Sequence, residues 1–290
     1  MHDGAVGLID SGATLALAER LLACGVELLV WDRDADGCED LAELGAEPVI
    51  ALDEFMERCD IVLLCVDDAV AMDEFVLGVE GMAAFAAEEQ ILVDLAHTAP
   101  TATRRLAHEL AQRSGMAWVD APLLGDFGGA GDGSPSSVVG GAEADVAHVL
   151  PLLESLCSRV TYMGEVGAGQ AARLCHAMLT GSTTLAIAET IAWAERNGVE
   201  TERLPAALEN TAADSPLLQC IGARMAVRES EPASLRIAAL RGELEQALEC
   251  ARESGATLPM IALMTQLLYQ HGLRTSADED LATLIELYSA

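Results

Sequence analysis

The first part of the chain alternates between short apolar runs and stretches with helical spacing. Residues 4–9 and 26–31 are apolar runs of strand length, and between them apolar residues recur every three or four positions up to Ala23. Further strand-like runs follow at residues 61–66, 91–95, 117–119, 137–139 and 160–162. Strands that alternate with helices form a parallel sheet with helices on both faces. We therefore expect a Rossmann-type, doubly wound α/β domain over residues 1–165.

Beyond residue 169 the spacing is helical throughout. Residues 170–197 contain no proline and one glycine, Gly181, and they are apolar almost all round, which predicts one long and largely buried helix. Shorter helical stretches occupy residues 202–210, 216–226, 235–253, 259–271 and 279–287. We expect an all-α domain over residues 166–290, opened by this long interdomain helix.

Composition excludes several classes of function. The chain is 51% hydrophobic and carries a formal charge of −31, and all sixteen basic residues are arginine. A protein without a basic stripe does not neutralise phosphates, and anionic lipid repels it, so we expect neither nucleic-acid nor membrane binding. The chain has no apolar run long enough to span a bilayer and no basic start of a signal peptide, which predicts a cytoplasmic protein. Without lysine, it has no side-chain amine for catalysis.

The cysteines do not indicate a metal site. Eight are scattered along the chain, with no C-x-x-C motif and no Cys/His spacing that suits zinc. Most fall inside apolar patterns, as small core residues do. We therefore expect no metal, and cysteines kept reduced in the cytoplasm.

The first strand-to-helix turn carries a weakened dinucleotide fingerprint. A G-x-G-x-x-G motif aligns with D-S-G-A-T-L at residues 10–15, so of the three glycines only Gly12 is present. Asp10 adds a carboxylate near the phosphate position, and Leu15 is bulkier than the glycine that permits close helix packing. A cofactor would contact the turn itself, which consists of Ser11, Gly12, Ala13 and Thr14.

Asp32 ends the second strand-like run, twenty residues after Gly12. An acidic residue here bonds the ribose hydroxyls and disfavours a 2′-phosphate, which favours NAD over NADP. The next residue, Arg33, could stack on adenine. An ordinary acidic residue at a strand end is the alternative interpretation.

Five further segments follow in a fixed order along the chain. They are V-D-L-A-H-T-A-P at residues 93–100, D-A-P-L-L-G-D at 120–126, G-S-P-S-S-V-V-G-G at 133–141, G-E-V-G-A-G-Q at 164–170 with Arg173 and His176, and R-I with E-L at 236–237 and 243–244. The series covers nearly the whole chain and resembles the β-hydroxyacid dehydrogenases. Within that family it is most similar to 3-hydroxyisobutyrate dehydrogenases and 2-hydroxy-3-oxopropionate reductases.

The resemblance implies an altered catalytic centre on the long helix. Arg173 stands where the family has its lysine general acid/base, and a guanidinium stays protonated, so it cannot exchange a proton near neutrality. Arg173 can still hold a carboxylate in a bidentate grip, or pair with an acidic neighbour. His176 replaces the family's asparagine and could titrate near neutral pH.

Other positions that contact ligands in the family also differ. Val66 replaces a proline after the fourth strand, His97 replaces a threonine near the nicotinamide, Leu124 and Asp126 replace a serine and a glycine of the substrate loop around Gly125, and Gly242 replaces a second lysine. The scaffold glycines are kept; they are Gly125, Gly140, Gly141, Gly167 and Gly169. The changes thus cluster at ligand positions.

Two hypotheses remain open. The first is an NAD(P)-dependent oxidoreductase with a rebuilt, non-lysine site that acts on a small carbonyl or imine compound; imine reductases resemble this fold and also lack the lysine. The second is a catalytically degenerate relative that serves as a binding, regulatory or scaffold subunit. In either case the long apolar helix, through which relatives dimerise, predicts a homodimer.

Overall fold

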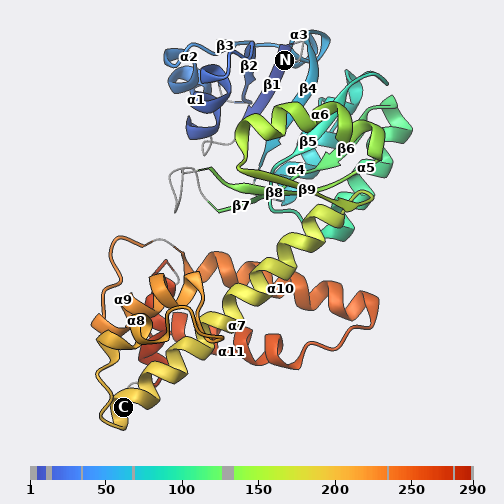
Figure 1. Cartoon of the computed structure of the whole chain (residues 1–290). Coiled ribbons are helices and arrows are strands. Elements are labelled where there is room, and N and C mark those ends of the chain that lie inside the picture. The colour runs from blue at the N-terminus through green and yellow to red at the C-terminus, as the bar shows by residue number, and fades with distance from the viewer. Residues whose placement is uncertain are drawn as a thin grey trace. The chain divides into compact units, whose positions relative to one another are not determined.

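The computed structural model describes residues 5–10, 15–33, 35–66, 69–125, 134–233, 235–276 and 278–288. The chain divides into two compact units, Met1–Arg173 and Leu174–Ala290. The first is a sheet covered by helices, and the second is helical (Figure 1).

The described part of the first unit contains a nine-stranded sheet in the order β3-β2-β1-β4-β5-β6-β8-β7, with β9 beside β8. The strands are β1 (Ala5–Asp10), β2 (Leu28–Trp31), β3 (Glu47–Pro48), β4 (Cys59–Cys65), β5 (Ile91–Asp94), β6 (Ala117–Asp120), β7 (Leu123–Leu124), β8 (Ser136–Gly140) and β9 (Arg159–Gly164). Strands β1 to β6 are parallel, which confirms the doubly wound arrangement.

The far edge of the sheet departs from the expected parallel pattern. Strand β8 runs antiparallel to β6 and β7, and β9 returns parallel to β8. An apolar run looks the same in either direction, so the sequence pattern did not reveal the reversal at β8. Strands β3 and β7 have two residues each and are too short to produce a pattern.

Helices cover both faces of this sheet because its strands are apolar on both sides. One core lies under α1 (Leu15–Ala23), α2 (Glu39–Glu43) and α6 (Glu143–Leu156) and includes Leu8 and Val119. The other lies under α3 (Leu52–Arg58), α4 (Ala69–Leu77) and α5 (Pro100–Ser114) and includes Ile9 and Trp118. Neighbouring residues of one strand thus enter opposite cores.

The long helix α7 runs unbroken over Ala168–Arg196, as its spacing predicted. It is followed by α8 (Leu204–Leu208), a π-helical turn (Leu218–Gly222) that leads into α9 (Ala223–Val227), α10 (Ile237–Ser254), α11 (Pro259–Gly272) and a 3-10 segment (Leu281–Tyr288). The last segment was expected as an α-helix. The core of this unit includes Ile191, Leu240 and Met264. Within the described ranges, no helix combines the length and apolarity needed to cross a membrane.

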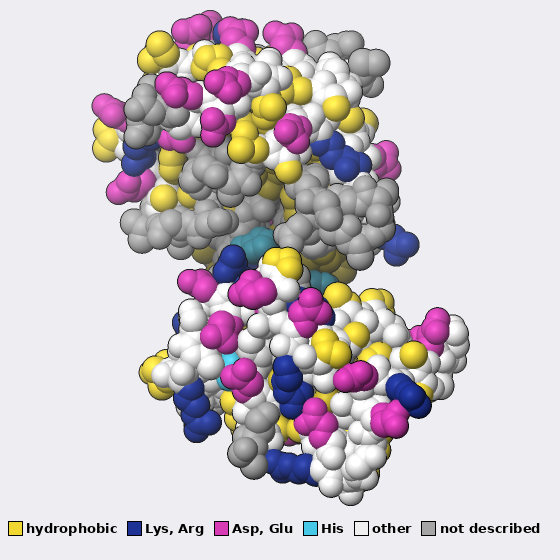
Figure 2. Space-filling model, turned by 90° about the vertical axis from the view of Figure 1, so that its left-hand side faces the viewer, with side chains coloured by type: hydrophobic (Ala, Val, Ile, Leu, Met, Phe, Trp, Pro, Cys, Tyr) yellow, Lys and Arg dark blue, Asp and Glu magenta, His cyan; other side chains and the backbone are white. Residues whose placement is uncertain are grey.

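Carboxylates are dispersed over the face of the molecule that Figure 2 shows. On the face in Figure 2 the acidic side chains stand singly or in small groups among apolar and neutral ones, and arginines are fewer. Many described arginines are paired with acids, as Arg58 is with Glu47 at 2.7 Å. The face shown in Figure 2 therefore presents no broad basic stripe of the kind that binds nucleic acid.

Candidate active site

The turn between β1 and α1 is where the fingerprint was expected. Ser11, Gly12, Ala13 and Thr14 lie outside the described residues, as does the side chain of Asp10. Leu15 is 45% exposed, while Leu17, Ala18 and Leu21 are buried against the sheet. The Leu15 side chain therefore points away from the helix–sheet contact, and α1 packs on the sheet through Leu17, Ala18 and Leu21.

Asp32 and Arg33 follow β2 directly. The Asp32 side chain lies so close to Gly37 that a Cβ at Gly37 would overlap its carboxylate. Arg33 forms an ion pair with Glu74 at 3.0 Å, and its guanidinium lies 4.7 Å from the centroid of the Phe75 ring. The guanidinium of Arg33 thus lies over the Phe75 ring and beside the Glu74 carboxylate.

Other predicted ligand positions lie in segments that follow the strands. Val66 is buried after β4, and His97 is exposed after β5. Because β4 and β5 are adjacent and parallel, these residues share the carboxyl edge of the sheet, where doubly wound folds bind ligands. Leu124 is half-buried in β7, and Gly125 has a φ of +94° that favours glycine. Asp126 lies outside the described residues.

Two buried carboxylates lie side by side at the same edge. Asp94 ends β5 and Asp120 ends β6, and the two residues are register partners. Asp120 accepts hydrogen bonds from the backbone N–H groups of Gly167 at 2.6 Å and Gln170 at 2.8 Å, and it thereby holds the start of α7. Asp94 accepts one from the backbone of Ala96 at 3.0 Å.

Burial raises the pKa of both carboxyl groups. For Asp94 the pKa rises to about 8; the hydrogen bond from Ala96 opposes this shift, and the charge of Asp120 adds to it. For Asp120 burial again dominates, against the hydrogen bonds from Gly167 and Gln170, which favour the ionised form. The pair therefore binds a proton more readily than exposed carboxylates do.

Arg173 is fixed close to this pair. It is 1% exposed; its Nε donates to Gln170 Oε1 at 2.9 Å, and its Nη2 donates to the backbone oxygen of Thr98 at 3.2 Å. Gln170 in turn donates from Nε2 to the backbone oxygen of Ala96 at 2.6 Å. Arg173 is thus attached to the segment that follows β5, and both of these partners are neutral.

Two scaffold glycines are enclosed by this arrangement. A Cβ at Gly169 would lie 2.6 Å from the backbone oxygen of Asp120 and 2.8 Å from its Oδ2. A Cβ at Gly140 would lie 2.6 Å from Asp120 Oδ1. Real Cβ atoms do not approach so closely, so glycine is the residue that fits at either position.

Two predicted positions belong to the second unit. His176 is exposed on α7, one turn beyond Arg173. Gly242 lies inside α10, and a Cβ there would meet no heavy atom within 4 Å. The fold therefore does not require glycine at residue 242.

Several residues of the buried network were not singled out by the sequence. Asp94, Thr98, Asp120 and Gln170 belong to the motifs, but only the neighbouring ligand positions were assigned roles. The signal was present: Asp94 and Asp120 each end an apolar strand-like run. The carboxyl ends of adjacent parallel strands meet, so two such acids are expected side by side.

The arrangement suits anion binding better than proton transfer at Arg173. A guanidinium offers up to five N–H donors and remains charged at any physiological pH. A carboxylate or a developing oxyanion is its natural partner. If a proton moves in this region, a group other than Arg173 must carry it.

Comparisons with known proteins agree with this geometry. Residues 4–164 match the model of the NAD-binding domain of 6-phosphogluconate dehydrogenase, and residues 167–288 match the NAD-binding domain of NADP-dependent 3-hydroxyisobutyrate dehydrogenase. The chain is 28% identical to 3-hydroxyisobutyrate dehydrogenase of Pseudomonas aeruginosa over 98% of this chain and 97% of that protein. It is 29% identical to 2-hydroxy-3-oxopropionate reductase of Escherichia coli, over 92% and 90% respectively.

Solved structures share the fold. The 3-hydroxyisobutyrate dehydrogenase of Mycobacterium tuberculosis, solved with L-serine, matches with a TM-score of 0.89 at 20% identity over 99% of both chains. An imine reductase of Bacillus cereus matches with a TM-score of 0.64 at 20% identity over 98% of this chain and 99% of that one. The motifs, the fold and both domain matches lead to one conclusion: the chain belongs to the β-hydroxyacid dehydrogenase family of NAD(P)-dependent oxidoreductases.

Proposed function

We propose that this protein is an active oxidoreductase that reduces a small carbonyl or imine compound and uses Arg173 to bind an anionic group instead of to move a proton. The observation that carries the proposal is the fixed position of Arg173. Gln170 and the Thr98 carbonyl hold its guanidinium near the carboxyl ends of β5 and β6. Such preorganisation is what a binding or oxyanion-stabilising group requires.

The described residues fit a dinucleotide at the carboxyl edge of the sheet. Asp32 is partly exposed at the end of β2, where a carboxylate can bond the ribose hydroxyls, and we propose NAD as the preferred form. In this proposal the phosphates meet residues 11–14, adenine meets Arg33, and Val66 and His97 flank the nicotinamide. When bound, the nicotinamide supplies or accepts the hydride.

The substrate would lie between the loop at residues 124–126 and Arg173. Leu124 offers an apolar contact where the family has a hydroxyl, and Asp126 adds a negative charge, so we propose that the anionic group of the substrate faces Arg173 and not this loop. His176 is the proposed proton donor, because its imidazole is exposed on α7 one turn beyond Arg173. An imine substrate that is already protonated when it binds would need little proton donation from His176.

A second function is favoured by one specific observation. Arg173 is 1% exposed and bonds to its own chain, which suits a structural role. In that case the protein is a catalytically degenerate family member that acts as a binding, regulatory or scaffold subunit. Both candidates are compatible with a homodimer, which is supported by exposed apolar residues on α7, such as Leu179 at 70% and Trp193 at 65%.

Turnover measurements distinguish the two functions. We would follow NADH and NADPH oxidation with small aldehydes, ketones and cyclic imines, each with and without a carboxylate. The active-enzyme proposal expects turnover of at least one class, and Arg173→Met should raise KM more for carboxylated than for neutral substrates. Arg203→Ala, at a side chain that is 81% exposed, serves as the matched control. Absence of turnover with every class would favour the degenerate alternative.

A further inference from the structure

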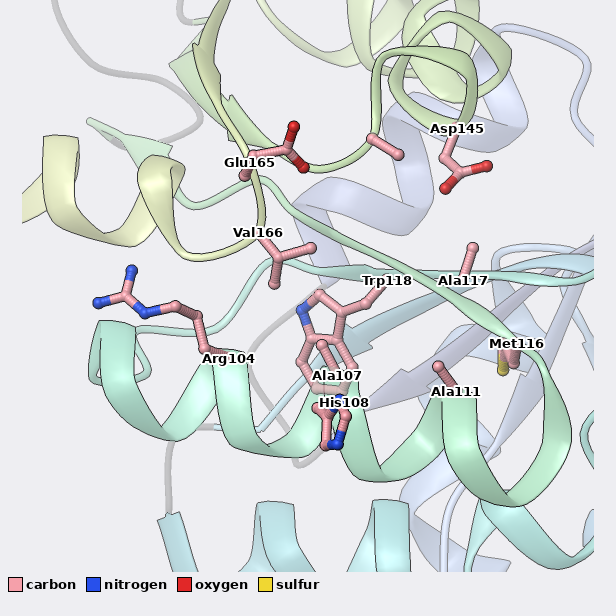
Figure 3. Close-up of a pocket in the computed structure, with 11 residues that line it drawn as sticks. Arg104, Ala107, His108, Ala111, Met116, Ala117, Trp118, Asp145, Glu165 and Val166 are labelled. Carbon is pink, nitrogen blue, oxygen red and sulfur yellow. The ribbon is translucent and has the colours of Figure 1, made fainter.

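The first unit contains a pocket that none of the proposed nucleotide or substrate residues lines. It has a volume of about 410 Å³ and lies between α5, β6, the start of α6 and the segment that joins β9 to α7 (Figure 3). Strands β6 and β8 pair only at Asp120 and Gly140, so the sheet opens beside the earlier residues of β6. Small-molecule sites are typically about 300–1,000 Å³, and this pocket falls in that range.

A buried hydrogen-bond donor faces this pocket. The Trp118 side chain is 3% exposed, and its indole Nε1 has no hydrogen-bond partner in the part of the chain that the structure describes. Figure 3 shows the nitrogen-bearing edge of the ring turned toward Val166, and both residues line the pocket. A buried donor without an acceptor is unfavourable, and a ligand oxygen in the pocket would satisfy it.

Basic and acidic side chains line opposite walls. Arg104 and His108 lie on α5, while Glu165 and Asp145 lie on the facing wall (Figure 3). Within the described residues, none of these four side chains forms an ion pair or a side-chain hydrogen bond with another. The pocket therefore keeps a wall with basic side chains apart from a wall with acidic side chains.

The neighbouring arginine behaves differently. Arg105 donates to Asp73 at 2.7 Å and to Glu109 at 3.2 Å, outside the pocket. Arg104 is in the same helix of the same acidic protein, and it makes no such bond among the described residues. The contrast leaves the Arg104 guanidinium as a donor for a ligand.

We propose that this pocket binds a small zwitterion of the amino-acid class with an apolar side chain. The carboxylate would accept hydrogen bonds from Arg104, His108 and the Trp118 indole. The ammonium would face Glu165 and Asp145. The apolar side chain would pack against Val166 and the alanines of α5, and no covalent step is involved.

Simpler ligands satisfy the pocket less well. An anion without an ammonium would meet the two carboxylates of Glu165 and Asp145 on a chain of net charge −31. A cation without a carboxylate would leave the Trp118 donor and Arg104 without an acceptor. A neutral apolar molecule would remove the basic and acidic side chains of the two walls from water without pairing them, which costs free energy.

Calorimetry on the unmodified protein tests the proposal. Leucine is the probe, and 3-methylbutylamine and 4-methylpentanoate are the matched compounds that lack the carboxylate or the ammonium. We expect saturable leucine binding, at least tenfold weaker binding of each truncated compound, and at least tenfold loss of leucine affinity in Arg104→Ala. Arg105→Ala should leave leucine affinity unchanged.

A fluorescence measurement locates the site. In a Trp31→Phe, Trp193→Phe chain the sole remaining tryptophan is Trp118, and leucine should change its emission with the same midpoint as the calorimetric titration. The proposal is wrong if leucine, methionine and phenylalanine all fail to bind at millimolar concentration, if the truncated compounds bind equally well, or if Arg104→Ala and Arg105→Ala have equal effects. The measurements use no nucleotide, so their failure would not bear on the oxidoreductase proposal.

Discussion

Gly169 in α7 and Gly242 in α10 both lie in helices, but their surroundings are opposite. A Cβ at Gly169 would lie 2.5 Å from the backbone oxygen of Val138 and 2.6 Å from that of Asp120, whereas a Cβ at Gly242 would meet nothing within 4 Å. Gly169 matches the family motif, and Gly242 stands where the motif has a lysine. Packing therefore determines which residue fits at position 169, whereas only contact with a ligand would determine the residue at position 242.

The largest predicted effect is on catalysis, and it comes from the positions that differ from the family motifs. We predict that the protein does not oxidise 3-hydroxyisobutyrate or reduce 2-hydroxy-3-oxopropionate at ordinary enzyme rates, because Arg173 cannot act as a general acid/base. Such catalysis is typically worth about 100- to 10,000-fold. Arg173→Lys alone should not restore the activity, since Leu124 and Asp126 still alter the substrate loop. Robust turnover of either compound by the unaltered chain in a steady-state assay would refute this prediction.

The next largest effect should come from Gly169, the crowded position, and it is on the free energy of unfolding. Gly169→Ala would force a methyl group against two backbone carbonyls, which cannot move without displacing β6 and β8. We expect a loss of about 3 kcal/mol in the free energy of unfolding, at the upper end of the usual cost of overpacking. Urea denaturation would measure it. A loss no larger than about 0.5 kcal/mol, the usual range for exposed sites, would show that this edge is looser than described.

The buried carboxylates predict a pH dependence. Because the pKa of Asp94 is raised to about 8, the folded protein holds a proton that the unfolded chain has already lost. Stability should therefore fall as pH rises from about 4 to about 8. Asp94→Asn keeps an acceptor oxygen and cannot titrate. The free energy of unfolding of this variant minus that of the unaltered protein should therefore increase with pH, by up to about 1.4 kcal/mol per pH unit. Parallel stability curves from urea melts at pH 5 and pH 8 would contradict this prediction.

Gly242, the open position, should give the smallest effect on stability, and substitution there should stabilise the protein. Gly242→Ala places a methyl group in free space inside a helix and removes the conformational freedom of glycine. We expect a gain of about 0.5–1 kcal/mol in the free energy of unfolding. Gly181→Ala is the matched control in α7, because its Cβ would lie 2.8 Å from the sulfur of Met264. Destabilisation by Gly242→Ala would mean that residue 242 is enclosed.

The sequence predicted the elements whose pattern is local. The parallel strands β1, β2, β4, β5 and β6 and the unbroken helix α7 each produce a run or a spacing that can be recognised without knowledge of their neighbours. The direction of β8 and the two-residue strands β3 and β7 depend on pairing with distant residues. Apolar spacing does not encode that pairing.

The candidate site was predictable only in part, for a similar reason. The motif identified Arg173 but not its bonds to Gln170 and to Thr98, of which the second joins segments 75 residues apart. The pocket beside Trp118 depends on the divergence of β6 and β8, and no local feature of the sequence signals it. Residues 11–14 and Asp126 stay predictions, because they lie outside the described residues.

A calorimetric titration of NADH and NADPH, each at low and at high salt, tests the oxidoreductase proposal most directly. A chain of charge −31 repels the phosphates of either nucleotide, and salt screens this repulsion over a Debye length that falls from about 10 Å at 0.1 M to about 3 Å at 1 M. We predict saturable binding that tightens with salt, with NADH preferred because of Asp32. Failure of both nucleotides to bind even at high salt would contradict the proposal.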